Sequence, residues 1–240
     1  MILPTIRASF GRSDALHLVD LVGRGDPELR ASSRARLESE GVDSLLDDPR
    51  VLNALLTDPE VAAPPSLIFY VLVRQALLEV GVDDRGTADF VASLVVAFGN
   101  ARRAYRISDR DEEEFHYLVD MVAGLDRAGE RRAFLLRSHL GNFSLWLAGL
   151  FPDFLEARTR RRGAPPIEYY ERMGMMSYQL ASESRAARDL GVEALLEGVS
   201  RDFGRLRGAL NRVSDRYLWP HGGDPVGRLL REVGGRGEVR

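Results

Sequence analysis

The chain contains no cysteine and no lysine, so all 33 of its lysine-or-arginine positions are arginine. Without cysteine there is no disulfide bond, no thiolate nucleophile and no zinc or iron–sulfur site held by cysteine ligands. Without lysine there is no primary amine for a Schiff base, for pyridoxal phosphate or for the phosphate-binding loop of nucleotide hydrolases. These two absences exclude several classes of enzyme before any motif is considered.

Long hydrophobic runs are also missing. The longest uncharged apolar stretch, Leu140–Pro152, falls short of the roughly 20 residues that a helix needs to cross a bilayer. Nothing in residues 1–12 resembles a signal peptide, and the common catalytic motifs GxSxG, HExxH and GxxxxGK do not occur. We therefore expect a cytoplasmic protein without a membrane span, and no motif indicates a reaction.

Signals for β-strands are scarce, whereas signals for helix ends are frequent. No Asn-Gly or Asp-Gly turn separates alternating runs, and β-branched residues seldom cluster. Asp26-Pro27 and Asp48-Pro49 each place a capping carboxylate before a proline that suits the first helical position. The sequence predicts an all-α protein, a multi-helix bundle with about six core helices plus short N-terminal helices.

The breaks in the pattern divide the chain into three parts. We expect an N-terminal short-helix subdomain or extension over residues 1–62, a main helical bundle over 63–220, and a C-terminal short helix with a flexible tail over 221–240. The predicted core helices cover residues 66–80, 87–103, 109–125, 131–151, 167–183 and 192–218. The first two are apolar on nearly every side, which predicts a place in the middle of the core.

Charge is distributed unevenly. The first 126 residues carry 22 acidic and 13 basic side chains, whereas residues 127–219 carry 11 acidic and 16 basic ones. The two halves could pack on each other or face different partners. Because the whole chain is acidic, with a net charge of −3, nucleic acid is not the favoured partner.

One group of side chains has the spacing of a metal site. Glu113, His116 and Asp120 would share one face of a helix, and Glu-x-x-His is the unit by which helical-bundle proteins bind iron or manganese. No second Glu-x-x-His is present, so His139 or Glu171 would have to complete the site. The alternative is that these acids complement a helix dipole beside a partly buried histidine.

Arginine clusters indicate a second kind of site. Guanidinium groups bind carboxylates and phosphates, so two stripes are candidates for binding a protein partner or an anion. The alternative is a solvated helix face, because acidic residues lie among the second set. The candidate residues are Arg158, Arg160, Arg161 and Arg162 in the first stripe, and Arg201, Arg205, Arg212 and Arg216 in the second.

The clearest periodicity lies near the C-terminus. Gly204 and Gly208 would allow a neighbouring helix to approach closely, and that neighbour could belong to the same chain or to a second copy. Apolar residues alternate in steps of three and four at Leu196, Val199, Phe203, Leu206, Leu210, Val213 and Tyr217. This seam predicts a protein partner or a homo-oligomer through the helix at 196–217.

Two functions from different classes remain. The first is a non-catalytic helical module that binds a partner or regulates one, through the seam, the arginines or both. The alternative is a helical-bundle metalloenzyme or small-ligand-binding enzyme with Glu113, His116 and Asp120 as its ligands.

Overall fold

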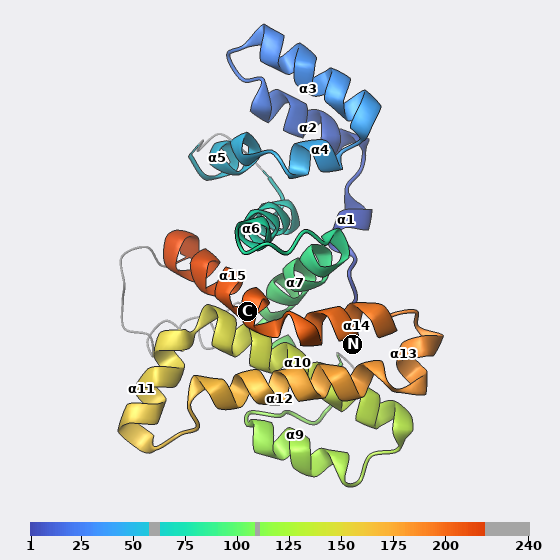
Figure 1. The fold of residues 1–240 in the computed structure, drawn as a ribbon, viewed down its shortest axis with the longest axis vertical. Coiled ribbons are helices and arrows are strands. Elements are labelled where there is room, and N and C mark those ends of the chain that lie inside the picture. The colour runs from blue at the N-terminus through green and yellow to red at the C-terminus, as the bar shows by residue number, and fades with distance from the viewer. Residues whose placement is uncertain (58–62, 109–110, 219–240) are drawn as a thin grey trace, which may run out of the picture. The chain divides into compact units, whose positions relative to one another are not determined.

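A computed structural model describes residues 1–57, 63–108 and 111–218 of the chain. These residues form helices and connecting segments, and no β-strand occurs among them (Figure 1). The predicted all-α, multi-helix fold is therefore confirmed. No helix in the described part of the chain is both long enough and apolar enough to span a membrane. The segment predicted as a C-terminal helix and tail, residues 221–240, lies outside the described residues.

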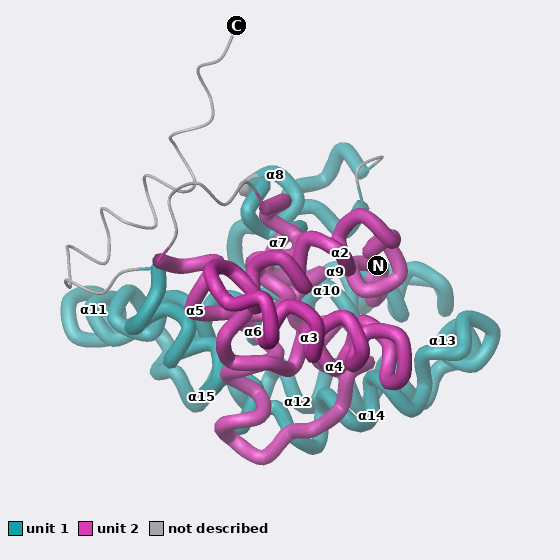
Figure 2. The backbone as a smooth tube through the Cα atoms, turned by 90° about the horizontal axis from the view of Figure 1, so that it is seen from above, with its two compact units in different colours: residues 1–2, 97–240 teal, residues 3–96 magenta. Residues whose placement is uncertain are grey.

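The chain divides into two compact units (Figure 2). Unit 2 comprises residues 3–96, and unit 1 comprises residues 1–2 and those from 97 onward. The division between these units falls near residue 96. The boundary expected near residue 62 lies outside the described residues and stays a prediction. The helices of unit 2 are α1 (Ile6–Ser9), α2 (Arg12–Val22), α3 (Pro27–Glu40), α4 (Asp43–Leu46), α5 (Pro49–Thr57), α6 (Pro65–Glu79) and α7 (Arg85–Phe98), whose last two residues belong to unit 1.

Local signals explain where the helices of unit 2 begin and end. The carboxylate of Asp26 accepts hydrogen bonds from the backbone N–H groups of Glu28 and Leu29, each at 3.0 Å, and Pro27 is the first residue of α3. Gly41 ends the helix with a φ of +81°, which is costly for other residues. The capping pattern read from the sequence is thus confirmed at this helix.

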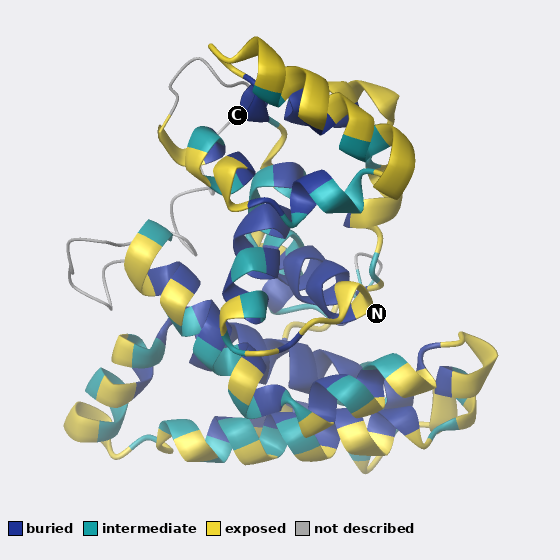
Figure 3. Cartoon of the chain, turned by 45° about the horizontal axis from the view of Figure 1, so that its top comes forward, coloured by how far each residue is buried: buried dark blue, intermediate teal, exposed yellow. Residues whose placement is uncertain are grey.

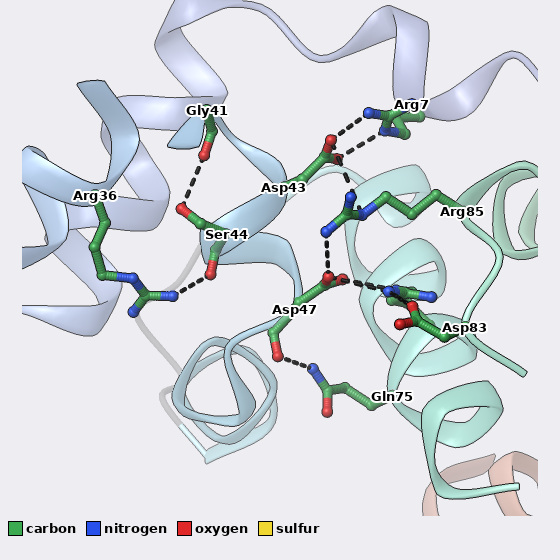
Figure 4. A network of polar contacts seen from close by, with 10 residues as sticks. Arg7, Arg36, Gly41, Asp43, Ser44, Asp47, Gln75, Asp83 and Arg85 are labelled. Atoms are coloured by element: carbon green, nitrogen blue, oxygen red, sulfur yellow. Dashed lines mark hydrogen bonds and ion pairs between the residues drawn. The ribbon is translucent and has the colours of Figure 1, made fainter. Parts of the chain in front are cut away.

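Arginine–carboxylate pairs join the short helices of unit 2 to α6 (Figure 4). Arg7 on α1 pairs with Asp43 on α4. Arg85, at the start of α7, donates to the carboxylate of Asp47 at 2.8 Å, and Arg74 on α6 donates to the same carboxylate. Elements that are far apart in the sequence are therefore held together by charge-assisted hydrogen bonds.

The helices of unit 1 agree with most of the predicted ranges. They are α8 (Ala101–Ala104), α9 (Leu118–Leu125), α10 (Glu130–Leu150), α11 (Pro152–Arg162), α12 (Ile167–Ser182), α13 (Arg185–Asp189), α14 (Glu193–Arg201), α15 (Phe203–Val213) and a π-helical turn at Ser214–Leu218. Two predictions were wrong in detail. The helix expected at 109–125 begins only at Leu118, and the helix expected at 192–218 is interrupted at Asp202.

Helix α10 forms the centre of unit 1 and is buried along most of its length (Figure 3). It packs against α12 and α15, and α12 packs against α14. Glycines allow these close approaches: a Cβ on Gly141 would lie 2.8 Å from the ring of Tyr178, and one on Gly149 would lie 2.8 Å from Leu210. Of the two glycines that the sequence pattern singled out, Gly204 is also approached closely, since a Cβ there would lie 2.7 Å from the Oε1 of Glu171 on α12, whereas Gly208 has no such neighbour among the described residues.

The heptad seam packs inside the chain. Its apolar residues from Leu196 to Val213 are buried, and they belong to α14 and α15, which contact α12 and α10. For these residues the neighbour is internal, because the chain's own helices cover them. A protein partner or a second copy at the helix 196–217 stays a prediction.

Candidate functional site

The structure does not bring the predicted metal ligands onto one helix face. Glu113 and His116 lie before the start of α9, in a non-helical segment, and Asp120 lies inside that helix. The carboxylate of Glu113 accepts a hydrogen bond from Arg132 at 2.8 Å instead. No group of three or more histidine, aspartate or glutamate side chains that could hold a metal ion occurs in residues 1–57, 63–108 and 111–218.

The two residues suggested to complete that site are engaged elsewhere. His139 is buried on α10, and burial lowers the pKa of its imidazole to about 3, so the ring is neutral at physiological pH. Glu171 on α12 pairs with Arg207 at 3.4 Å. The Glu-x-x-His spacing that suggested an iron or manganese site therefore does not lie on a helix, and the described residues do not gather the predicted ligands.

Each arginine of the second stripe takes part in a contact of its own. Arg201 and Arg205 both pair with Asp202, at 3.3 and 3.6 Å. Arg212 and Arg216 each take part in a polar, ionic or ring contact as well. This stripe is therefore not a set of free cations.

The first stripe lies on α11, whose ends have clear causes. Pro152 occupies the first turn, where its fixed φ is favourable, and Gly163 ends the helix in the left-handed region with a φ of +61°. The backbone N–H of Gly163 donates to the carbonyl of Thr159 at 3.1 Å. Arginines in the last turn also complement the negative end of the helix dipole.

The arginines of α11 divide into two groups. Arg160 is 76% exposed and pairs with Glu156 one turn earlier, at 3.5 Å. Arg158, Arg161 and Arg162 follow the i, i+3, i+4 spacing that places side chains on one face of a helix. No carboxylate in the described ranges lies within ion-pair distance of these three side chains. We call this set (Arg158, Arg161 and Arg162) the α11 basic face.

Aromatic rings hold Arg158 at the base of this face. The guanidinium carbon lies 5.5 Å from the ring centroid of Phe154, one turn earlier, and 5.9 Å from that of Tyr117. Both distances fall within the range of cation–π attraction. The Arg158 side chain is half-buried, and its Nε has no hydrogen-bond acceptor within the part of the chain that the structure describes. The guanidinium is thus positioned by rings and not by a counter-ion.

Two tyrosine hydroxyls lie in the electrostatic field of Arg158. Burial raises the pKa of both Tyr105 and Tyr170, and the positive charge of Arg158 acts in the opposite direction. No hydrogen bond to either hydroxyl is found within residues 1–57, 63–108 and 111–218. Both hydroxyls therefore remain protonated at physiological pH and can donate hydrogen bonds.

The segment before α9 positions Tyr105 at this site. The backbone N–H of Phe115 donates to the carbonyl of Tyr105 at 2.8 Å, and the buried side chain of Phe115 anchors the segment. The ring of Tyr105 lies 4.7 Å from that of His116 and 6.0 Å from that of Phe143 on α10. These contacts fix the tyrosine between the segment and the central helix.

A surface hollow of about 360 Å³ borders the same helix. It is lined by Asp153, Ala157, Arg160 and Arg161. Arg161 thus lies both at the rim of this hollow and on the α11 basic face. The site is open to solvent, which suits binding of a group presented from outside.

Sequence reasoning found the arginines of this site but missed its aromatic residues. Phe154 lies four residues before Arg158, and this helical spacing was a usable signal. Tyr105 and Tyr117 lie about 40 to 50 residues earlier in the chain, and no local pattern links them to α11.

Comparison with known proteins gives no match, whether against family models, curated proteins or solved structures. The function has to be argued from the site itself.

Proposed function

We propose that the chain is a non-catalytic helical module that binds a partner through an anionic group, a carboxylate or a phosphate, at the α11 basic face. A single observation carries this proposal. Arg158 is half-buried, its Nε has no acceptor, and no carboxylate within the described residues is paired with it.

The physical argument starts from the cost of burying a charge. Removing a guanidinium from water without a counter-ion is unfavourable, and proteins usually compensate by pairing it. Within the described residues, carboxylates pair with Arg74, Arg132 and Arg207, whereas none lies within ion-pair distance of Arg158. An anion that binds Arg158 supplies the missing partner, and Arg161 and Arg162 add favourable charge at the rim.

The contacts of Arg158 suit binding and not catalysis. The described residues place aromatic rings against its guanidinium, and among them no nucleophile is hydrogen-bonded to a base beside it. Such a site binds an anion without reacting with it.

The proposal can be tested by isothermal titration calorimetry with tripolyphosphate, a compact polyanion. We expect Arg158→Gln to weaken binding by about tenfold or more, because a hydrogen bond to a charged group contributes roughly 1.5–3 kcal/mol. Arg185→Gln is the matched control, since Arg185 is 76% exposed, pairs with Asp189 on α13 and does not line the hollow beside α11. Added salt should weaken the binding.

Either of two results would contradict the proposal. One is the absence of binding to the native chain at low ionic strength. The other is an equal loss of affinity in the Arg158→Gln and Arg185→Gln variants, which would indicate a non-specific effect of net charge. Circular dichroism of both variants should show unchanged helix content.

A further inference from the structure

A second surface hollow, of about 450 Å³, lies between the first two turns of α10 and the short helix α13. Both helices belong to unit 1, and they contact each other. We call this feature the α10–α13 hollow. It shares no lining residue with the hollow beside α11. Its volume falls within the roughly 300–1,000 Å³ that is typical of sites for small molecules.

Part of the wall of the α10–α13 hollow is apolar. Phe134 and Leu135 line it from α10, and Leu190 lines it from the end of α13. Phe134 is only 1% exposed, whereas Leu190 is 52% exposed. A ligand that covers Leu190 would remove apolar surface from water, which favours binding.

The end of α13 holds Leu190 in this exposed place. The backbone N–H of Val192 donates to the carbonyl of Ala187, and that of Gly191 donates to the carbonyl of Arg188, each at 3.0 Å. Gly191 has a φ of +66°, so these bonds form the Schellman motif that ends many helices. Val192 and Ala187 are buried, which anchors the turn. The exposed leucine is therefore part of a structured surface and not of a frayed helix end.

Four charged side chains also line the hollow. Arg185 and Asp189 on α13 pair with each other at 3.7 Å. Glu130 and Arg131 are consecutive residues in the first turn of α10, and both are exposed. The side chain of neither residue has an ion pair or a hydrogen bond with another group in the described ranges. The hollow therefore presents one unmatched carboxylate and one unmatched guanidinium.

These two unmatched charges favour a ligand that carries both signs. A purely anionic ligand would be attracted by Arg131 and repelled by Glu130, and a purely cationic ligand would meet the reverse. An α-amino acid carries an ammonium and a carboxylate on one carbon atom, so its two charges are as close together as this neighbouring pair requires. A large apolar side chain on the same molecule would cover Leu190.

From this arrangement we infer that the α10–α13 hollow binds a free α-amino acid with a large apolar side chain. The carboxylate of the ligand pairs with Arg131, its ammonium pairs with Glu130, and its side chain lies against Leu190. This site goes beyond the proposed function, because it needs neither Arg158 nor any other residue of the α11 basic face.

The test titrates four probes into the isotope-labelled native chain at neutral pH and follows the amide chemical shifts. The probes are phenylalanine, phenethylamine, which lacks the carboxylate, 3-phenylpropionate, which lacks the ammonium, and glycine, which lacks the ring. We expect phenylalanine to bind about threefold or more tighter than either singly charged analogue, because it gains one exposed ion pair. It should bind about tenfold or more tighter than glycine, because its ring is covered.

Two variants separate the roles of the charges. Glu130→Gln should weaken phenylalanine and phenethylamine by about threefold without weakening 3-phenylpropionate. Arg131→Gln should weaken phenylalanine and 3-phenylpropionate by a similar factor without weakening phenethylamine. The matched controls are Glu193→Gln, in the first turn of α14, and Arg127→Gln, since both residues are exposed and neither lines the hollow.

A third variant tests the apolar wall. Leu190→Ala should weaken phenylalanine by about threefold and glycine much less, because it removes apolar surface that the ring covers. Leu180→Ala is the matched control, since Leu180 on α12 is 42% exposed and does not line the hollow. Circular dichroism of every variant should show unchanged helix content.

Three results would overturn the inference. The first is binding of phenylalanine that is no tighter than that of both singly charged analogues, and the second is an equal loss of affinity in the site and control variants. The third is the absence of saturable binding at millimolar phenylalanine, which would favour an apolar segment of a partner protein as the occupant of the hollow.

Discussion

Arg74 and Asp47 form a buried ion pair that joins α6 to the end of α4. The Nε and Nη2 of Arg74 donate to the two carboxylate oxygens of Asp47 at 2.6 and 3.0 Å, and Arg74 is only 1% exposed. Asp83 also pairs with Arg74, and Arg85 donates to Asp47. These charge-assisted bonds raise the pKa of Arg74 and lower that of Asp47, although desolvation opposes both shifts.

Removing the buried cation should destabilise unit 2 strongly. We expect Arg74→Met to lower the free energy of unfolding by about 3 kcal/mol, because the carboxylates would lose the partner that compensates their desolvation. Arg85→Met is the matched control: Arg85 is largely exposed, and its loss should cost about 1 kcal/mol or less. Urea denaturation followed by circular dichroism measures the free energy of unfolding of both variants. Equal losses in the two variants would contradict the burial seen for Arg74.

Asp48 should make stability depend on acidic pH. Its carboxylate is 5% exposed, and although desolvation tends to raise its pKa, hydrogen bonds from Arg50 and Arg36 lower it from 3.8 to about 2. Because the folded pKa is the lower one, the ionised form stabilises the fold above pH 3.8. This contribution, about 2 kcal/mol, should be lost as the pH falls toward 2.

The measurement is the free energy of unfolding near pH 5 and near pH 2. Asp48→Asn should be less stable than the native chain near pH 5 and should lose less stability between the two conditions, because it has no proton to gain. If the variant and the native chain lost the same free energy of unfolding between pH 5 and pH 2, Asp48 would not be the titrating group.

The sequence indicated the long helices well because their ends carry local signals. Pro65, Pro152 and Gly163 mark starts and stops that depend on backbone geometry alone. Residues 111–117 carry no such signal, and their acidic side chains favour the first turn of a helix in the sequence pattern. The segment is not helical, and contacts with residues distant in the sequence hold it instead, including the hydrogen bond from the backbone N–H of Phe115 to the carbonyl of Tyr105.

The candidate site could be predicted only in part, for a related reason. Runs of arginine are visible in a sequence, but whether an arginine is paired depends on residues elsewhere, as Glu171 shows for Arg207. In the same way, an asparagine inside an apolar helix, such as Asn142, needs a hydrogen-bond partner if it is buried, and the sequence does not show which residue that is. The structure supplies it, since the hydroxyl of Tyr178 donates to the Oδ1 of Asn142 at 2.8 Å.

Glycine substitutions test the packing of unit 1 most directly, because the sequence and the structure point to different positions. A Cβ at Gly174 on α12 would lie 2.3 Å from the ring of Phe203, which is fully buried. We expect Gly174→Ala to lower the free energy of unfolding by about 2 kcal/mol or more through overpacking. At Gly208 on α15 the described residues place no atom from outside the helix's own backbone within 4 Å of the same position. Gly208→Ala should therefore stabilise the chain by up to about 1 kcal/mol through helix propensity.

Urea denaturation followed by tryptophan fluorescence measures both variants, since Trp146 lies on the central helix of the same unit. The heptad pattern alone predicts that Gly208→Ala is harmful, because it assigns that glycine to a helix contact. The structure predicts the opposite sign, because α10, α12 and α15 approach one another at Gly141, Gly149 and Gly174. A loss of stability in Gly208→Ala comparable to that in Gly174→Ala would show that another helix covers α15 at this position.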